Sequence, residues 1–304
     1  MYTSRILIAV SISTAQAANG IYLPDRLYHR STTAAPVSRF GYTGVTGPVD
    51  WAGLGLENVA CAISSTQSPI NLDTSIHAPA TNPSVRIPNV KNADFENLGT
   101  TVDVIVNGTT IFGGKEYRMS QFHFHTPSEH RIDKMYFPLE MHMVHKAAVS
   151  SLLDYGTKPT RFQRIDNSTL VMGAFFELTE DNSTTDLLTT LSQRLDRIAT
   201  PGAVTQAGPL NFELIISHFE TTPLFQYIGS LTTPPCTEGV TWLIARTPLP
   251  MNVRTFLAFK DCMKYNARYI QNTLGEDNLI VVAASQLPRT RDPKSPNPVI
   301  GKWW

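Results

Sequence analysis

Two segments in which polar and apolar residues alternate restrict the fold of this chain more than any other part of its sequence. The first is Gln121-Phe-His-Phe-His125 and the second is Glu140-Met-His-Met-Val144. Side chains two residues apart on a β-strand point to the same face of a sheet. His123 and His125 therefore share one face, and the two phenylalanines serve the opposite, apolar one. A single antiparallel pairing of the two segments brings His142 beside the first two histidines.

Three imidazoles that converge on one point are typical of a metal site. A His-x-His pair alone is more often ordinary polar or core structure, and it is the second strand that favours a metal. Two of the histidines follow a hydrogen-bonding residue on the same face, Gln121 before His123 and Glu140 before His142. Such partners fix the tautomer and the orientation of ligand histidines. Three neutral imidazoles with a fourth position open to water are a catalytic rather than a structural zinc arrangement, although the spacing does not name the reaction.

The rest of the chain is predominantly β in pattern. Strand-like runs separated by turns occupy residues 101–106, 121–125, 139–145, 169–178, 212–217 and 240–245. One amphipathic helix is predicted after a Ser183/Thr184 cap and before Pro201-Gly202, where apolar residues recur at helical spacing: Leu187, Leu188, Leu191, Leu195 and Ile198. The polar, irregular run 146–167 is expected to be a long loop beside the core.

The N-terminal residues resemble a secretory signal. Arg5 supplies a positive charge, residues 6–12 are apolar, and Ala15-Gln16-Ala17 is a small-x-small cleavage site. We expect a signal peptide over residues 1–17, an extension over 18–39, one domain over 40–290 and a tail over 291–304. The expected location is extracellular, and glycosylation is expected at the three N-x-[ST] sequons, which begin at Asn107, Asn167 and Asn182.

The charge balance restricts the kinds of molecule that the protein can bind, and the cysteine content restricts its disulfides. Lys+Arg and Asp+Glu number 25 each, so no basic field attracts nucleic acid or anionic lipid. No stretch after the signal reaches the roughly 20 apolar residues that span a bilayer. We therefore expect a small-molecule partner. The three cysteines allow one disulfide and one free thiol in an oxidising compartment, and counting does not choose the pair.

Several ordered motifs together closely resemble the α-carbonic anhydrases, over roughly residues 40 to 290. The most specific is Gly229-Ser-Leu-Thr-Thr-Pro-Pro-Cys236. The others are Phe40-Gly-Tyr42, Trp51, Gln67-Ser-Pro69, Gln121-Phe-His-Phe-His125, Ser128-Glu-His130, Glu140-Met-His-Met-Val-His145, Glu238-Gly-Val-Thr-Trp242 and Asn266-Ala-Arg268. The implied fold is mostly β (α+β), a single domain on a large, mainly antiparallel twisted sheet with a few surface helices.

The resemblance implies a role for each matched site residue. Zn²⁺ would be bound by His123, His125 and His142. Gln121 would bond His123, Glu140 would bond His142, and the backbone carbonyl near Asn266 would bond His125. His130 would be structural, bonded to Glu140 and Tyr227. Thr232 would accept a hydrogen bond from zinc hydroxide and donate its proton to an ionised Glu129. The histidines left without a role are His29, His77, His145 and His218.

The resemblance also implies the reaction, CO₂ + H₂O ⇌ HCO₃⁻ + H⁺, by attack of zinc-bound hydroxide, with esterase activity as a side reaction. Carbon dioxide, bicarbonate and water would be the partners. An alternative is a metal-free binding module of the same fold, but such relatives typically replace a ligand histidine. The implied disulfide joins Cys61 to Cys236 and leaves Cys262 free. The implied substrate pocket consists of Val144, Val171, Leu231, Thr233, Val240 and Trp242.

One position departs from the family pattern. Many fast members carry a proton-shuttling histidine where this chain has Thr100. A threonine hydroxyl does not take up and release protons near pH 7, whereas histidine does. The carboxylate of Asp103 is a poor proton acceptor at neutral pH, since its ordinary pKa is about 4. We therefore expect proton removal to rely on water and buffer.

Overall fold

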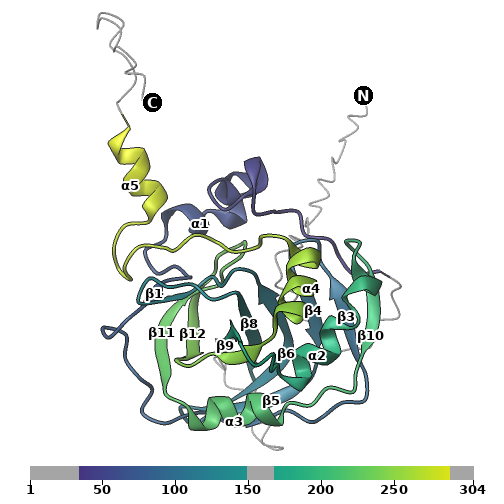
Figure 1. Ribbon diagram of the computed structural model, residues 1–304. Coiled ribbons are helices and arrows are strands. Elements are labelled where there is room, and N and C mark those ends of the chain that lie inside the picture. Colours follow the sequence, from purple (N-terminus) through teal and green to yellow (C-terminus); the bar gives the residue numbers. More distant parts are fainter. Residues whose placement is uncertain (1–33, 149–167, 288–304) are drawn as a thin grey trace, which may run out of the picture.

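The computed structural model describes residues 34–148 and 168–287, and a single large sheet organises them (Figure 1). The order of its main path is β10-β3-β4-β6-β8-β9-β12-β11, with β13 beside β9, β5 beside β6 and β2 beside β5. The eleven strands described are β2 (Ser84–Arg86), β3 (Ala93–Asn97), β4 (Val102–Ile105), β5 (Gly108–Phe112), β6 (Lys115–His125), β8 (Leu139–Ala147), β9 (Thr169–Leu178), β10 (Val204–Ala207), β11 (Leu224–Ser230), β12 (Glu238–Ala245) and β13 (Leu249–Met251).

Most of these pairings are antiparallel, while β12 and β13 each run parallel to β9. A second, two-stranded sheet pairs β1 (Asn71–Leu72) with β7 (Arg131–Ile132). The helices are α1 (Ala60–Ile63), α2 (Asp186–Ser192), α3 (Glu213–Thr221), α4 (Val253–Met263) and α5 (Leu279–Gln286), with short 3₁₀ turns η1 (Gly44–Thr46), η2 (Trp51–Leu54), η3 (Leu56–Asn58) and η4 (Leu195–Ile198). The predicted mostly-β fold on a mainly antiparallel, twisted sheet is confirmed.

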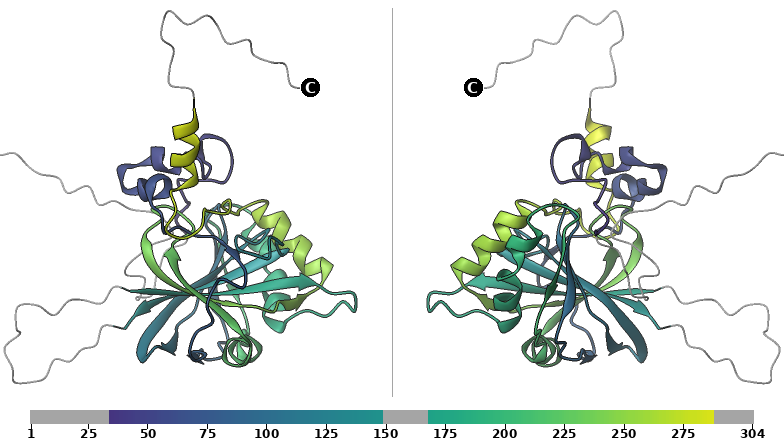
Figure 2. Two further views of the ribbon diagram at one scale, coloured as in Figure 1. Left: turned by 90° about the vertical axis from the view of Figure 1, so that its left-hand side faces the viewer. Right: turned by 90° about the vertical axis from the view of Figure 1, so that its right-hand side faces the viewer.

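The central pair of strands follows the predicted alternation. β6 and β8 pair antiparallel with His123 opposite His142 and Phe122 opposite Met143. Phe122, Phe124 and Met143 are completely buried in the main core, against residues of α2, α3 and α4. Those helices lie along one face of the sheet, while α1 and α5 stand together at one end of the molecule (Figures 1 and 2). Burial of this apolar face fixes the histidines on the other.

Three details of the predicted secondary structure are wrong. The predicted strand 212–217 is instead the N-cap, Phe212, and the start of helix α3, whose buried side chains Ile215, His218 and Phe219 recur at helical spacing. The run of apolar residues around Ile215 masks that period. The leucine-rich helix begins at a Thr185 cap, whose hydroxyl accepts a hydrogen bond from the backbone N–H of Leu188 at 3.2 Å, and a separate turn, η4, follows it. Strand β8 also extends into the predicted loop as far as Ala147.

Several predicted segments lie outside the described residues, namely the signal peptide, most of the N-terminal extension, most of the 146–167 loop and the C-terminal tail. The described end of the extension packs against the domain. The N–H of Ala35 donates to the carbonyl of Gly202, and the N–H of Ser38 donates to the carbonyl of Leu98, each at 2.9 Å. The described end of the extension is therefore hydrogen-bonded to the residues that follow β3 and precede β10.

A disulfide joins Cys61 and Cys236, which are 175 residues apart, and Cys262 is free and half-buried. This is the pair that the resemblance implied. Reducing it is expected to lower the free energy of unfolding by about 2–4 kcal/mol, because a long loop is no longer closed in the unfolded chain. Urea titrations of oxidised and reduced protein measure the difference, with Cys262→Ser as the control that leaves the disulfide intact. Equal midpoints in the two states would contradict the expectation.

Candidate metal centre

The three histidines of β6 and β8 meet on the polar face of the sheet. One ring nitrogen from each of His123, His125 and His142 lies within 4.8 Å of the other two. All three side chains are buried, and their ring centroids lie 4.6–5.4 Å apart. The antiparallel register produces this cluster, since it sets His142 directly opposite His123 while His125 lies two residues farther along β6.

Hydrogen bonds determine which nitrogen of each ring is available. Nδ1 of His123 lies 2.9 Å from Oε1 of Gln121, and Nδ1 of His125 lies 2.8 Å from the backbone oxygen of Asn266. Nε2 of His142 lies 2.7 Å from Oε1 of Glu140. Because these oxygens only accept, each of these nitrogens carries the proton. The remaining nitrogens, Nε2 of His123 and His125 and Nδ1 of His142, therefore keep their lone pairs for a metal.

The described residues satisfy two further conditions for a zinc ion. Nε2 of His125 and Oε2 of Glu129 are buried, lie 3.4 Å apart and have no hydrogen-bond partner within the described part of the chain. Buried polar atoms without a partner are costly, and a metal ion bound by the histidines would satisfy Nε2 of His125. Burial, together with the neighbouring imidazoles, lowers the pKa of His123 well below its ordinary value, and burial lowers that of His125 to about 3. The rings are therefore neutral, as zinc ligands must be.

A buried network holds Glu140 behind the histidines. Its carboxylate accepts hydrogen bonds from His142, from the ring of His130 at 2.7 Å and from the backbone N–H groups of residues 129 and 130. Since Nδ1 of His130 donates to Glu140, its Nε2 accepts from the Tyr227 hydroxyl at 2.6 Å. The Tyr227 hydroxyl in turn lies 2.7 Å from Ser68 Oγ, which accepts from the N–H of Ser230. Burial alone would raise the pKa of Glu140, but His130 and His142 lower it well below the ordinary value.

Glu129 lies beside His125 and His142, and its Oε1 accepts a hydrogen bond from the backbone N–H of Arg268 at 2.9 Å. Burial raises the pKa of Glu129 well above its usual range, while hydrogen bonding to the Thr232 side chain and to Arg268 lowers it. A nearby dication lowers the pKa of a carboxyl further. The resemblance implies an ionised Glu129, which burial opposes and a bound metal would favour.

A pocket opens beside His123 and His142. It contains five of the six residues implied for substrate and Thr232, and its full lining is Gln121, His123, His142, Val144, Val171, Leu231, Thr232, Thr233 and Trp242. Val240 is not part of this lining and belongs to the same apolar cluster as Val171 and Trp242. The pocket thus combines an apolar wall with two threonine hydroxyls.

The position of the family's proton shuttle is covered in this chain. Thr100 is buried, its hydroxyl lies 2.9 Å from that of Ser38, and its carbonyl accepts from the Asn266 side chain. Asp103 is also buried and pairs with His123 in the β4–β6 register. Of the histidines without an assigned role, His77 is exposed and His29 lies outside the described residues.

The other two unassigned histidines are buried and hydrogen-bonded. His145 lies on β8 with its ring between the Thr110 hydroxyl and the Met143 carbonyl, and His218 donates to the carbonyl of Thr247. Both are satisfied core residues. Ser68, Ser230 and Arg268 are functional neighbours that the sequence did not assign. All three lie inside the quoted motifs, so the motifs indicated their positions but not their contacts.

Metal-free protein is expected to lose stability as the pH falls from 6.5 to 4. Burial lowers the pKa of His145 from 6.5 to about 4. Below pH 6.5 the unfolded chain binds a proton at this ring and the folded chain does not, so acid favours unfolding. The protonation of His145 alone lowers the free energy of unfolding by about 3 kcal/mol between pH 6.5 and pH 4.

Urea unfolding of EDTA-treated protein across this pH range measures the slope of the free energy of unfolding against pH. The variant His145→Gln should have a shallower slope than the wild type, because it no longer titrates. His77→Gln, which replaces an exposed histidine, is the control and should keep the wild-type slope. An unchanged slope in His145→Gln would contradict the assignment.

Two further observations concern the exposure of the glycosylation sequons and the character of the helices. Asn107 and Asn182 are exposed, and Asn167 lies outside the described residues. Within residues 34–148 and 168–287, no helix has both the length and the apolar character required to cross a bilayer.

Comparison with known proteins agrees with the geometry of the centre. Residues 46–278 match the family described as eukaryotic-type carbonic anhydrase. The α-carbonic anhydrase of Aspergillus oryzae is 39% identical with a TM-score of 0.74, over 82% of this chain and 100% of that one. A carbonic anhydrase of Neisseria gonorrhoeae is 31% identical over 69% of this chain and 75% of its own length. A dioscorin solved with ascorbate is 25% identical with a TM-score of 0.63, over 78% and 95% of the two chains. The chain therefore belongs to the eukaryotic-type α-carbonic anhydrases, a family of enzymes that hydrate carbon dioxide.

Proposed function

We propose that this chain catalyses the reversible hydration of carbon dioxide to bicarbonate with one zinc ion held by His123, His125 and His142. The observation that supports it most strongly is the set of three buried imidazoles, each with one nitrogen fixed as a donor and the other left unprotonated. When bound, zinc lowers the pKa of a coordinated water to about 7 and so supplies a nucleophile at neutral pH.

The protein's own residues orient the reactants. Thr232 lines the pocket, and its side chain hydrogen-bonds the Glu129 carboxyl. Its hydroxyl can donate to that carboxylate and accept one hydrogen bond from a water beside the histidines. Carbon dioxide is uncharged, so the apolar wall of Val144, Val171 and Trp242 suits it better than a charged clamp would. The same site supports hydrolysis of small esters as a side reaction.

The proposal extends to location. The disulfide between Cys61 and Cys236 is typical of an oxidising compartment, and the exposed Asn107 and Asn182 are accessible to glycosylation. With the signal-like residues 1–17, these features favour a secreted, extracellular glycoprotein.

A second candidate is a binding module that works without metal. It is favoured by the similarity to a dioscorin, which was solved with ascorbate. Against it stand all three ligand-type histidines and their hydrogen-bonding partners, which such a module would not need.

Zinc content and the rate of carbon dioxide hydration, measured on the same purified protein, separate the two. We expect one zinc per chain and a rate that disappears on chelation and returns on adding zinc. Zinc-free protein that gains no hydration activity when zinc is added would refute the enzyme and favour the binding module.

Turnover is expected to depend strongly on buffer concentration. The described residues that line the pocket include two histidines, His123 and His142, and both are proposed zinc ligands. No histidine of this lining is therefore left to act as a proton relay. The variant Thr100→His should raise the rate when buffer is scarce, by less than the roughly 10²–10⁴ of a well-positioned acid or base. Because Ser38 covers Thr100, the gain should be larger in the pair Thr100→His with Ser38→Gly.

Hydration rates at a series of buffer concentrations test this, and Ser38→Gly alone is the control. A native rate that is already high and independent of buffer would show that another relay exists.

A further inference from the structure

Arg268 has an unusual environment for a cation. Its side chain is 1% exposed, and its guanidinium donates to three neutral acceptors, Oε1 of Gln67 at 2.9 Å, the carbonyl of Ser68 at 2.7 Å and that of Cys61 at 3.1 Å. In the described part of the chain, none of its guanidinium hydrogen bonds ends on a carboxylate. Burying a charge is costly and is usually offset by a counter-ion. A role in holding parts of the structure together would explain why an arginine stands there.

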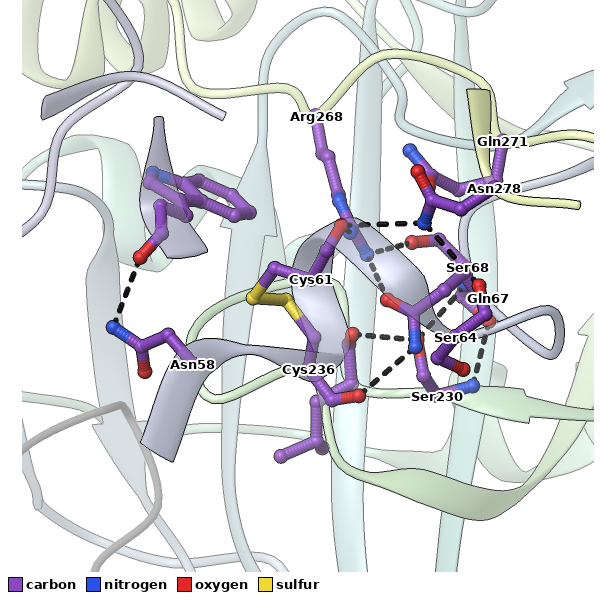
Figure 3. Close-up of a disulfide and its surroundings, with 12 residues drawn as sticks. Asn58, Cys61, Ser64, Gln67, Ser68, Ser230, Cys236, Arg268, Gln271 and Asn278 are labelled. Carbon is purple, nitrogen blue, oxygen red and sulfur yellow. Dashed lines mark hydrogen bonds between the residues drawn. A yellow bond between two sulfur atoms is a disulfide. The ribbon is translucent and has the colours of Figure 1, made fainter. Parts of the chain in front are cut away.

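The guanidinium connects both halves of the disulfide. It bonds the carbonyl of Cys61 directly, and it orients Gln67, whose Nε2 donates to the carbonyl of Cys236 at 3.0 Å. Figure 3 shows Arg268 and Gln67 side by side next to the sulfur–sulfur bond. Cys236 ends the loop that contains Thr232, and its N–H donates to the carbonyl of Thr233. The side chain of Arg268 is thereby fixed to the rim of the pocket.

The backbone of Arg268 contacts Glu129, which lies beside the three histidines. The N–H of Arg268 donates to Oε1 of Glu129 at 2.9 Å, which leaves Oε2 directed at the histidines, 3.4 Å from Nε2 of His125 and 3.9 Å from Nδ1 of His142. Two residues earlier, the carbonyl of Asn266 accepts from the ring of His125. A displacement of residues 266–268 would therefore change the orientation of Glu129.

We propose that Arg268 is a positioning residue: by anchoring its guanidinium in the Cys61–Ser68 segment, it fixes the backbone N–H that holds the Glu129 carboxyl in place beside the histidines. This rests on the proposed function, because Glu129 and Thr232 matter only if they orient a reactant. The planar fork of arginine matches this task, since it binds Gln67, Ser68 and Cys61 at the same time, whereas lysine offers a single ammonium on a flexible stem.

The test is a double-mutant cycle between Arg268→Gln and Thr232→Ala, read in kcat, KM and zinc content. A misplacement of about 1 Å can cost about 10²-fold in rate, so Arg268→Gln alone should lower kcat by about 10–100-fold. KM should change little, and one zinc per chain should remain. In the Thr232→Ala background the same change should lower kcat by less than about threefold, because the interaction it supports is already gone.

Two further variants keep the test decisive if Arg268→Gln folds poorly. Arg268→Lys and Gln67→Ala each remove part of the anchor and should show smaller losses of kcat with the same dependence on Thr232. Arg246→Gln is the matched control. Arg246 is half-buried, packs on the Phe225 ring and donates to the carbonyl of Leu224, and its loss should leave kcat near that of the wild type.

Three outcomes would overturn the proposal: equal losses in both backgrounds, loss of zinc instead of kcat, or a lowered melting temperature with unchanged kcat. A merely structural arginine would give one of these. Failure of the proposed function is distinguishable, because the wild type and Arg246→Gln would then also fail to hydrate carbon dioxide.

Discussion

Replacing His142 by alanine is expected to remove both the zinc and the hydration activity. Three imidazoles are the smallest protein set that holds a catalytic zinc, and the change leaves two. Loss of a partner that only supports a ligand already costs about 10–100-fold in metal affinity, so loss of the ligand itself should cost more. The rate should fall in proportion to the zinc content.

The structure offers a matched control on the same strand. His145 is also a buried histidine of β8, but its ring bonds Thr110 on the apolar face of the sheet. His145→Ala should destabilise the protein and keep one zinc per chain with normal turnover per zinc. Metal analysis and hydration assays of both variants check the assignment. Full zinc occupancy in His142→Ala would falsify it.

Removing the hydroxyl of Thr232 is expected to lower kcat by about 10²–10³-fold while zinc stays bound. That is the range found when a single positioned hydrogen-bond donor is deleted from an active site. The reason is that Thr232 lines the pocket and hydrogen-bonds the Glu129 carboxyl but is not one of the proposed ligands. Without it the attacking oxygen is no longer held in one orientation toward the substrate.

Two substitutions separate the hydroxyl from the shape of the side chain. Thr232→Val keeps the volume and loses the hydroxyl, and should be as slow as Thr232→Ala. Thr232→Ser keeps the hydroxyl and should retain most of the rate. Initial rates of hydration, with zinc measured on the same samples, give the comparison. A fast valine variant would show that the hydroxyl of Thr232 does not orient the reactant.

Sequence reasoning was most successful where the information is local. The alternation from Gln121 to His125 depends on the two-residue period of a strand, so it placed His123 and His125 on one face without knowledge of the fold. The second alternating segment required only one further assumption, an antiparallel pairing, to add His142. The same reasoning failed for helix α3, where consecutive apolar residues around Ile215 satisfy a strand and a helix equally well.

The resemblance to the family predicted contacts between distant residues, which the periodicity of the sequence does not predict. The pairing of Cys61 with Cys236 spans 175 residues, and no local pattern links them. Yet the matched motifs did not show that Val240 is not part of the pocket lining, or that Ser38 is hydrogen-bonded to Thr100. Those are contacts between separate segments, and each depends on how closely the segments approach in this particular chain.

The sequence by itself determined the two central strands, their polar and apolar faces and the three histidines, because strand geometry turns spacing into direction. Only the tertiary structure decided which nitrogen of each histidine is left for a metal. That choice depends on oxygens of Gln121, Asn266 and Glu140, and the carbonyl of Asn266 lies 141 residues from His125 along the chain. The same holds for Arg268, whose partners at residues 61–68 and 129 come together only when the chain folds. Hydrogen bonds between distant segments follow from three-dimensional packing, and packing is a property of the whole fold.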